Sequence, residues 1–351
     1  MLRGVGSTST PSFCPPSRAS QLARERLPAA GDRDLTGAAP DTPEGRFRVD
    51  LQPPLDIAGS LELFRRSGDD LIDRWDGTRL VRAIATAGLA IPFMATAIGD
   101  RAAPAFEVSA EPAHADLVRT TVGTTFAPAP ADYVRLLKAD PILAALDSRF
   151  PGIRQIRQLD LFTALIRCIS AQQVNLRWAV TTRRRLAETF GHRLEVAGQA
   201  VYSLDPERIA GVDPMHIRAL QFTTSKSVSI VATAQALVNE QLTVDTLTDL
   251  PDEEIVARLV AIKGIGRWSA EWVLARTLGR ARVVAGDLGV RKAVGLAYLN
   301  TPAPSEADVR SATAHWGASA GTAQAVLLHA LGEGGLATPP RLTGSRAASR
   351  R

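Results

Sequence analysis

The sequence has 351 residues, of which 45% are hydrophobic, and its formal net charge is +5 at pH 7. A chain of this length can bury the cores of two or three globular domains. It has no uninterrupted run of about 18 apolar residues and no apolar segment typical of a secretory signal near its first residue, which excludes a membrane protein or an exported one as the expected class. We therefore expect a cytoplasmic protein, associated with the nucleoid if its source is bacterial.

The positive charge is concentrated at the end of the chain. The last eleven residues contain no acid and four arginines: Arg341, Arg346, Arg350 and Arg351. The rest of the chain is close to neutral, so the net charge alone does not indicate a nucleic-acid partner. Local clusters such as Arg183–Arg185 fit a phosphate contact and a solvated helix face equally well.

Cysteine and histidine are too sparse and too scattered for a metal centre. Cys14 and Cys168 are the only cysteines, and they cannot form a disulfide framework, a thiolate zinc site or an iron–sulfur cluster. The five histidines show no metal-ligand or catalytic-triad spacing. We expect no metal and no cofactor.

The patterning divides the chain into a short β-containing part and a longer helical part. Residues 1–45 are rich in Pro, Ser, Gly and Ala and are expected to be disordered. Residues 46–126 predict a small α/β domain with an antiparallel sheet and a helix near Ile57–Arg66. The apolar runs assigned to the sheet are Phe47–Leu51, Leu80–Ile84, Ile91–Ile98, Phe106–Ser109 and Asp116–Val122.

From residue 127 to 335 the apolar residues recur with the period of a helix, which predicts an all-helical region. The expected helices are Tyr133–Leu146, Leu161–Ile169, Arg177–Phe190, Lys226–Glu240, Glu253–Ile262, Arg267–Leu278 and Leu288–Ala297. Residues 336–351 are expected to form a disordered basic tail. The predicted fold class is α+β and mostly α.

A tight glycine turn joins two of these helices, in the stretch LVAIKGIGRWSAEWV that begins at Leu259. Lys263 and Gly264 close the helix of residues 253–262, and the next helix begins directly after Gly266, so the connection requires positive φ angles that glycine adopts at little cost. Ile265 would point back between the helices, leaving the surrounding amides free to bind an anion such as a DNA phosphate. An ordinary connection with C-cap glycines has the same pattern.

An acidic residue follows the turn at a defined distance. Asp287 comes directly after Gly286 and before the helix that begins at Leu288. It fits a helix N-cap, and it also fits a partly buried anion that stabilises positive charge developing on a sugar. The two interpretations are compatible.

Together these motifs resemble the helix–hairpin–helix DNA glycosylase superfamily, and within it the branch of DNA-3-methyladenine glycosylase II. The resemblance extends over residues 47–335 and depends most on the hairpin L-x-x-I-x-G-I-G-x-W-[ST]-A and on Asp287, 19 positions beyond Trp268. The segment Ile169–Val174 is similar to the Gln-containing wedge segment of the family, and Ser225–Ile230 to its interior helix.

The resemblance implies a monofunctional DNA glycosylase of base excision repair that hydrolyses the N-glycosidic bond of alkylated purines, of the 3-methyladenine and 7-methylguanine type. It implies that the base is flipped out of the duplex and that Asp287 assists the attack of water on C1′. No lyase activity is expected, because Trp268 occupies the position where family members that nick DNA carry the lysine that forms a Schiff base. Lys263, in the hairpin, is not at that position.

Three further residues are candidates for the base site. Trp268 and Trp272 lie four apart on one helix face, where they could stack on a cationic base or simply pack in the helix core. Gln173 stands at the intercalating position of the family, where it could fill the gap left by the base or cap a surface helix.

The expected partner is damaged double-stranded DNA, bound by a monomer with no role for a membrane, and the resemblance leaves room for a monovalent cation at the hairpin. Two alternatives stay open. One is a noncatalytic helix–hairpin–helix DNA-binding protein, in which Asp287 is only a cap and the tryptophans are only core. The other is a glycosylase for a different damaged base.

Overall fold

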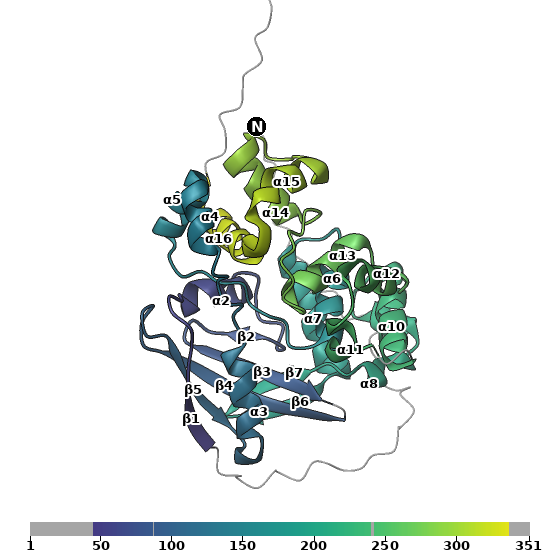
Figure 1. Ribbon diagram of the computed structural model, residues 1–351. Coiled ribbons are helices and arrows are strands. Elements are labelled where there is room, and N and C mark those ends of the chain that lie inside the picture. The colour runs from purple at the N-terminus through teal and green to yellow at the C-terminus, as the bar shows by residue number, and fades with distance from the viewer. Residues whose placement is uncertain (1–44, 87, 240–241, 337–351) are drawn as a thin grey trace, which may run out of the picture. The chain divides into compact units, whose positions relative to one another are not determined.

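The computed structural model of the protein describes residues 45–86, 88–239 and 242–336, all of which lie in one compact unit that begins at Pro43 (Figure 1). The expected disordered tails, 1–45 and 336–351, fall almost entirely outside these residues and stay a prediction, as do the boundaries of the domains. No helix in the described part of the chain is long and apolar enough to cross a membrane.

The first part of the unit is a five-stranded antiparallel sheet with the strand order β1-β5-β4-β3-β2. Its strands are β1 (Gly45–Asp50), β2 (Arg74–Trp75), β3 (Arg79–Thr86), β4 (Leu89–Ile98) and β5 (Ala105–Ala110), with α2 (Ile57–Arg66), η1 (Pro112–His114) and α3 (Ala115–Gly123) as the accompanying helices. Phe93 and Phe106 are fully buried in the core that the sheet forms with Leu61 of α2 and Val118 of α3. The helix α2 begins where the sequence predicts it, because the carboxylate of Asp56 accepts a hydrogen bond from the Gly59 amide at 2.8 Å.

The assignment of Asp116–Val122 to the sheet was wrong, because these residues form α3. Val118 and Val122 lie four residues apart and are both fully buried, whereas Leu117 is 42% exposed. That is the spacing of one helix face and not the alternation of a strand. An acid in the first turn, Asp116, also favours a helix start.

The rest of the unit is largely helical, as predicted, so the fold class is confirmed: α+β, mostly α, with a small antiparallel sheet at its beginning. The helical segments are α4 (Tyr133–Ala139), α5 (Pro141–Arg149), α6 (Leu161–Ala171), α7 (Leu176–Phe190), α8 (Pro206–Ala210), α9 (Pro214–Ala219), α10 (Thr224–Asn239), α11 (Val244–Thr248), α12 (Asp252–Val260), α13 (Arg267–Arg276), α14 (Leu288–Val294), the π-helical turn η2 (Gly295–Leu299), α15 (Glu306–Thr313), η3 (Ala314–Ser319) and α16 (Ala320–Gly332). The single helix expected at Tyr133–Leu146 is two helices. Asp140 ends the first and caps the second through the Leu143 amide, and Pro141 occupies the first turn of the second.

This region is not all-helical, which corrects the expectation for residues 127–335. A β-hairpin, β6 (His192–Val196) and β7 (Gln199–Ser203), lies between α7 and α8. Its turn residues Ala197 and Gly198 both have positive φ, of 47° and 69°, as the tight turns that join twisted strands require. Val196 and Val201 pack against Val81 of β3, so the hairpin lies on the sheet of the first part.

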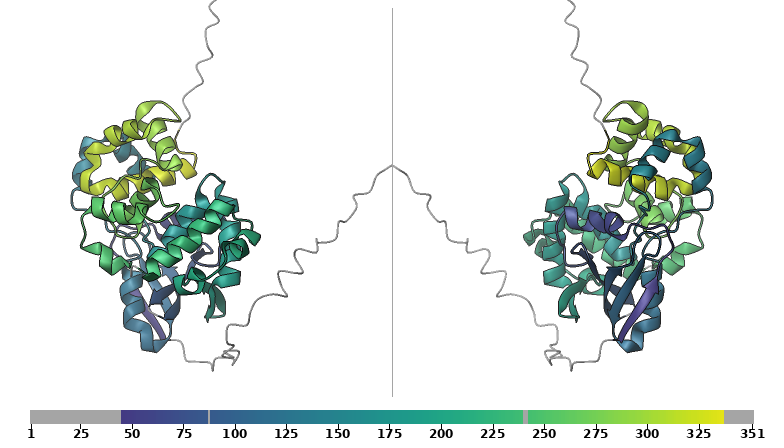
Figure 2. Two further views of the ribbon diagram at one scale, coloured as in Figure 1. Left: turned by 90° about the vertical axis from the view of Figure 1, so that its right-hand side faces the viewer. Right: turned by 90° about the vertical axis from the view of Figure 1, so that its left-hand side faces the viewer.

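The helices gather around two hydrophobic cores. One core contains α6, α7 and the helices from α8 to α13. The other joins α4 and α5 to α14, α15 and α16, so that segments about 150 residues apart in the chain pack together around Trp316. Figure 2 shows the yellow α16 next to the blue-teal helices of residues 133–149.

A buried ionic cluster connects the sheet to α6 and α7. Asp70 accepts hydrogen bonds from Arg183 at 2.9 Å and forms an ion pair with Arg167 at 3.0 Å, and Asp73 pairs with Arg82 and Arg167. Burial alone would raise the pKa of Asp70, but the two arginines more than offset it and lower the pKa to about 2. The cluster therefore stabilises the contact between the two parts as long as Asp70 is ionised.

Replacing Asp70 with Asn should lower the free energy of unfolding by about 3 kcal/mol at pH 7, because it leaves buried guanidinium groups without their carboxylate. The folded pKa lies below the unfolded value of 3.8, so this stabilisation is complete above that value and is lost as the pH falls toward 2. Over this pH range the ionised Asp70 should lose about 2 kcal/mol of its contribution to the free energy of unfolding. Urea unfolding of wild type and variant between pH 2 and pH 7 measures it.

Asp50→Asn is the matched control, since Asp50 forms an ion pair with Arg48 that is largely exposed on both sides. It should change the free energy of unfolding by well under about 1 kcal/mol. An Asp70→Asn difference that stays constant from pH 7 to pH 2 would contradict the role given to the ionised carboxylate.

Candidate nucleic-acid interface and active site

The glycine turn between α12 and α13 has the tight geometry that its sequence predicts. Gly264 has a φ of 88°, and a Cβ atom at this position would lie 1.9 Å from Oγ of Ser229 on α10. Glycine is therefore required here both for backbone conformation and for space. Ile265 is only 4% exposed and packs into the core formed by α6 to α13, as its place between the glycines predicts.

The outer side of the same turn is open. Gly266 is the N-cap of α13 without a side-chain hydrogen bond, and a Cβ atom there would meet nothing within 4 Å. The first amides of α13 therefore have no capping side chain, which is the arrangement that binds an anion at a helix N-terminus. Lys263 and Gly266 are exposed beside them.

The segment expected to act as a wedge is tied to this turn. Gln172 donates a hydrogen bond from Nε2 to the carbonyl oxygen of Gly264 at 3.2 Å. Gln173 is exposed and has a φ of 54°, a left-handed conformation that is uncommon for a residue other than glycine. The N-cap of α7 is Asn175, which accepts a hydrogen bond from the Trp178 amide at 2.8 Å, so Gln173 does not cap that helix.

Asp287 is held rigidly at the start of α14. One carboxylate oxygen, Oδ1, accepts a hydrogen bond from the Val290 amide at 3.0 Å, so the N-cap interpretation is correct. Among the residues that the structure describes, none donates a hydrogen bond to the other oxygen, Oδ2. The loop before it is fixed by α16, because the Val284 amide donates to Oε1 of Gln324 at 2.9 Å. A Cβ atom on Gly286 would lie 3.3 Å from Cβ of Trp268, so the loop packs directly against α13.

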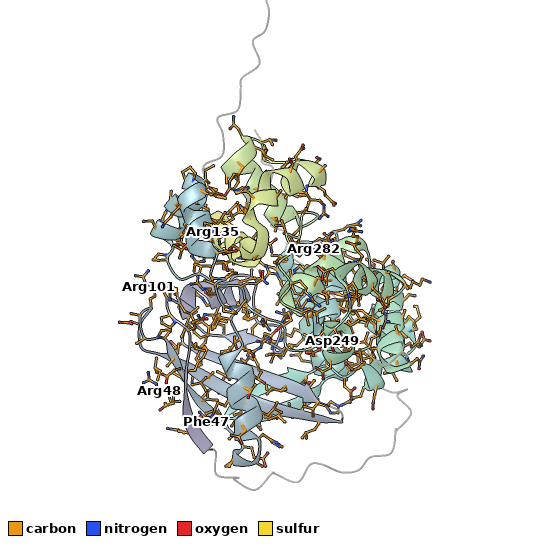
Figure 3. All side chains as sticks on the ribbon, viewed as in Figure 1. Phe47, Arg48, Arg101, Arg135, Asp249 and Arg282 are labelled. Atoms are coloured by element: carbon orange, nitrogen blue, oxygen red, sulfur yellow. The ribbon has the colours of Figure 1, made fainter. Side chains whose placement is uncertain are left out.

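A second ionic cluster holds α13 against its neighbours. Glu271 is 1% exposed and accepts hydrogen bonds from Arg267 on its own helix, from Arg282 in the loop before α14, and from Arg310 on α15, at 3.0–3.3 Å. Arg282, labelled in Figure 3, also pairs with Glu253 at the start of α12. The hairpin helices and the Asp287 loop are thus joined through one buried carboxylate.

A cleft of about 870 Å³ is lined by half of the predicted site residues. Its lining includes Asp287, Trp268, Trp272 and Gln173, together with residues of α2, α6, α7 and α16. This is the usual size of a small-molecule site. The hairpin residues Lys263, Gly264, Ile265 and Gly266 are not among the lining residues, so the structure separates the hairpin surface from the cleft. The roles given to all these residues stay predictions.

The sequence analysis missed several residues of the cleft, above all Arg276. It is 9% exposed and lies on α13, with Cζ 5.4 Å from the centroid of the Trp272 ring. Burial lowers its pKa, and the negative charge of Asp287 opposes this shift. The spacing of Trp268, Trp272 and Arg276, four residues each, was a signal that could have revealed it.

Other missed residues come from segments far away in the sequence. Cys168 on α6 lines the cleft as a buried group, and burial raises the pKa of its thiol, so it is neutral at pH 7. His329 on α16 and Phe64 on α2 also line the cleft. Within the described part of the chain, no group of three or more His, Cys, Asp or Glu residues is arranged to hold a metal ion.

Comparison with known proteins identifies the helical region. Residues 166–318 match the model of the HhH-GPD superfamily of base excision DNA repair proteins. This part of the chain belongs to that superfamily. It contains the hairpin and Asp287, so the family predicted from these motifs is confirmed.

Individual relatives agree with this result. A DNA-3-methyladenine glycosylase of Bacillus subtilis is 33% identical over 147 residues, which are 42% of this chain and 48% of that protein. A solved 3-methyladenine DNA-glycosylase of Archaeoglobus fulgidus has a TM-score of 0.71 at 25% identity and covers 81% of this chain and 98% of its own. An 8-oxoguanine glycosylase/lyase of Clostridium acetobutylicum, with a TM-score of 0.63 at 18% identity over 81% of this chain and 93% of its own, shares the fold. The chain spans about half the length of the Bacillus subtilis relatives that it matches.

Gly264→Ala should destabilise the protein by about 2 kcal/mol or more, because alanine is strained at this φ and its Cβ would overlap Ser229. Gly266→Ala is the matched control, since its φ of −99° suits any residue and its Cβ has open space. Thermal and urea unfolding of both variants test this. Equal stability of the two would mean that the turn does not have this geometry in solution.

Proposed function

We propose that this protein is a monofunctional DNA glycosylase of base excision repair that removes alkylated purines from double-stranded DNA. The observation that carries the proposal is the meeting of Asp287 with Trp268 and Trp272 in one cleft, beside the glycine turn of a fold of the HhH-GPD superfamily. The names of the relatives from Bacillus subtilis and Archaeoglobus fulgidus support the alkylated base as the substrate class.

In this proposal the hairpin binds the DNA backbone. The uncapped amides at the start of α13 donate to a phosphate of damaged duplex DNA, and Gly266 lets the backbone approach closely. Such binding needs no broad basic patch. We propose that the protein acts as a monomer and without a cofactor, and that a monovalent cation could be held by the hairpin carbonyls.

Reaching a base inside a duplex requires flipping it out of the stack, which costs a few kcal/mol. Gln173 is proposed to enter the gap. Gln173 lines the cleft, is exposed and has a left-handed backbone conformation. The neighbouring Gln172 donates a hydrogen bond to the carbonyl oxygen of Gly264 in the hairpin. Leu176 and Leu288, which are 53% and 76% exposed and also line the cleft, give its rim an apolar surface that can cover the neighbouring bases.

The chemistry proposed for the cleft is hydrolysis at C1′ of the flipped nucleotide. Alkylation makes the purine cationic and therefore a good leaving group. Stacking on the indole rings would favour binding of the cationic base over a normal base by about 0.5–2 kcal/mol. As the glycosidic bond breaks, its electron pair leaves with the base and positive charge develops on the sugar. The free oxygen of Asp287 stabilises this charge and orients a water whose oxygen bonds to C1′ and whose proton is lost to the carboxylate or solvent. The products are a free base and an abasic site.

A lyase step is not proposed. Trp268 cannot form a Schiff base with the sugar, and no lysine lies among the described residues that line the cleft. Incubation with methylated duplex DNA, followed by assay of free 3-methyladenine and 7-methylguanine, tests the glycosylase. Borohydride reduction in the same reaction tests the lyase. A DNA-binding protein without catalysis would release neither base, and a trapped covalent adduct would overturn the monofunctional assignment.

Asp287→Asn should reduce base release by at least about 100-fold, since it removes the charge that opposes the developing cation. Asn is as good an N-cap as Asp, so helix α14 and the stability of the protein should be preserved. Single-turnover release of 7-methylguanine measures the rate, and binding to an abasic-site duplex and thermal unfolding are the controls. A variant with wild-type rate would remove Asp287 from the mechanism.

Gln173→Ala should weaken binding to a duplex that contains a lesion by about 3- to 10-fold more than binding to an undamaged duplex, because only the flipped state needs the gap filled. Fluorescence anisotropy with the two duplexes measures this difference. Asn239→Ala, an exposed amide at the end of α10 and not a lining residue of the cleft, is a control. Equal weakening of both duplexes by Gln173→Ala would show a contact with the backbone and not a wedge.

A further inference from the structure

Arg276 is a buried cation with no hydrogen-bond acceptor. Of the other deeply buried arginines, Arg82 and Arg183 donate to the carboxylates of Asp73 and Asp70, and Arg154 donates to the carbonyl oxygen of Ile153. In contrast, the guanidinium of Arg276 donates no hydrogen bond to any residue that the structure describes, and its Nε is sealed from solvent without a partner. A buried guanidinium left in this state is costly, so a site that keeps one is built to receive an acceptor.

The position of Arg276 indicates where that acceptor would be. Its residue lines the cleft with Trp268, Trp272 and Asp287, and its guanidinium lies 5.4 Å from the centroid of Trp272. No carboxylate among the described residues forms an ion pair with it, although Asp287 lies within electrostatic range. A base that enters beside the tryptophans therefore meets a group that can only donate hydrogen bonds and that already carries a positive charge.

We propose that Arg276 determines specificity by donating hydrogen bonds to a carbonyl oxygen of the flipped base. This rests on the proposed glycosylase function and makes purines with a 6-oxo group the preferred substrates. Among alkylated purines it favours 7-methylguanine over 3-methyladenine, and it adds the unalkylated base hypoxanthine. Guanine O6 is an acceptor that pairs well with arginine, whereas the 6-amino group of adenine is a donor and would face the guanidinium with the wrong polarity.

The test uses one reaction in which two bases compete. Duplex DNA methylated at both adenine and guanine is incubated with the full-length protein, and the rates of release of 7-methylguanine and 3-methyladenine are measured together. Normalised to the amount of each lesion, their ratio reports relative kcat/KM and is independent of the fraction of active enzyme. Methylation blocks N7 of 7-methylguanine, so the guanidinium can donate only to O6. Arg276→Met should lower the ratio of 7-methylguanine to 3-methyladenine by roughly 10- to 100-fold, the value of one lost hydrogen bond to a charged group.

Arg276→Lys keeps the positive charge and loses the fork of donors, so it should lower the ratio by a smaller factor. If Arg276→Met is inactive on both lesions, the ratio is read from Arg276→Lys, and a wild-type ratio there overturns the proposal. Arg48→Met, an exposed arginine of β1 labelled in Figure 3, should leave the ratio and the rates unchanged.

The outcomes separate the two proposals. Wild-type protein that releases neither base refutes the glycosylase function itself. Wild-type protein that releases both, with rates that fall by the same factor in Arg276→Met, refutes only the specificity role and shows that Arg276 acts on every substrate alike, through Asp287 or through the fold. A duplex with a single hypoxanthine gives an independent check, because a neutral 6-oxo base should lose its release in Arg276→Met as 7-methylguanine does.

Discussion

The contact between Gly264 and Ser229 determines where α13 begins, and the rest of the site depends on it. The turn brings the chain so close to α10 that no side chain fits on the inner side, and Ile265 is forced into the core. The helix that follows, α13, contributes to two surfaces. Its uncapped amides lie at the outer side of the turn, and its Trp268 lines the cleft. A single close approach thus sets the distance between the surface proposed to hold DNA and the cleft proposed to hold a base.

The charged groups in and beside the cleft differ in whether they have hydrogen-bond partners. Glu271 accepts hydrogen bonds from three arginines and holds the loop that leads to Asp287. Asp287 accepts a hydrogen bond at Oδ1, and no donor to Oδ2 is found within the described part of the chain. Arg276 has no hydrogen-bonded partner among the described residues. One anion and one cation are therefore left available on the same wall of the cleft. Arg167 and Arg183, which also line the cleft, are paired with Asp70 and Asp73, and this distinguishes Arg276 from them.

Local signals in the sequence were sufficient for the parts of the site that are close in the chain. The N-cap at Asp287, the glycine turn and the buried Ile265 each follow from a few neighbouring residues. The wrong strand at Asp116–Val122 resulted from reading apolar content without its period, since the buried Val118 and Val122 are four apart. The β6–β7 hairpin was missed for a different reason. Its turn, Ala197-Gly198, has no proline or asparagine to mark it, and its valines are buried only because β3 lies against them.

The sequence could not predict the part of the cleft that α2 and α16 line, because these helices reach the cleft only through tertiary packing. Phe64 lies about 200 residues before Trp268 in the chain. His329 lies on α16, whose buried residues belong to another core, and no periodicity connects either residue with Trp268. Phe64 lies outside residues 166–318, the part that matches the superfamily. The hairpin and Asp287 lie within the matched part of the chain, whereas α2, which also lines the cleft, lies outside it. Substitutions on α2 can therefore change the shape of the proposed base site without any change in the matched part of the chain.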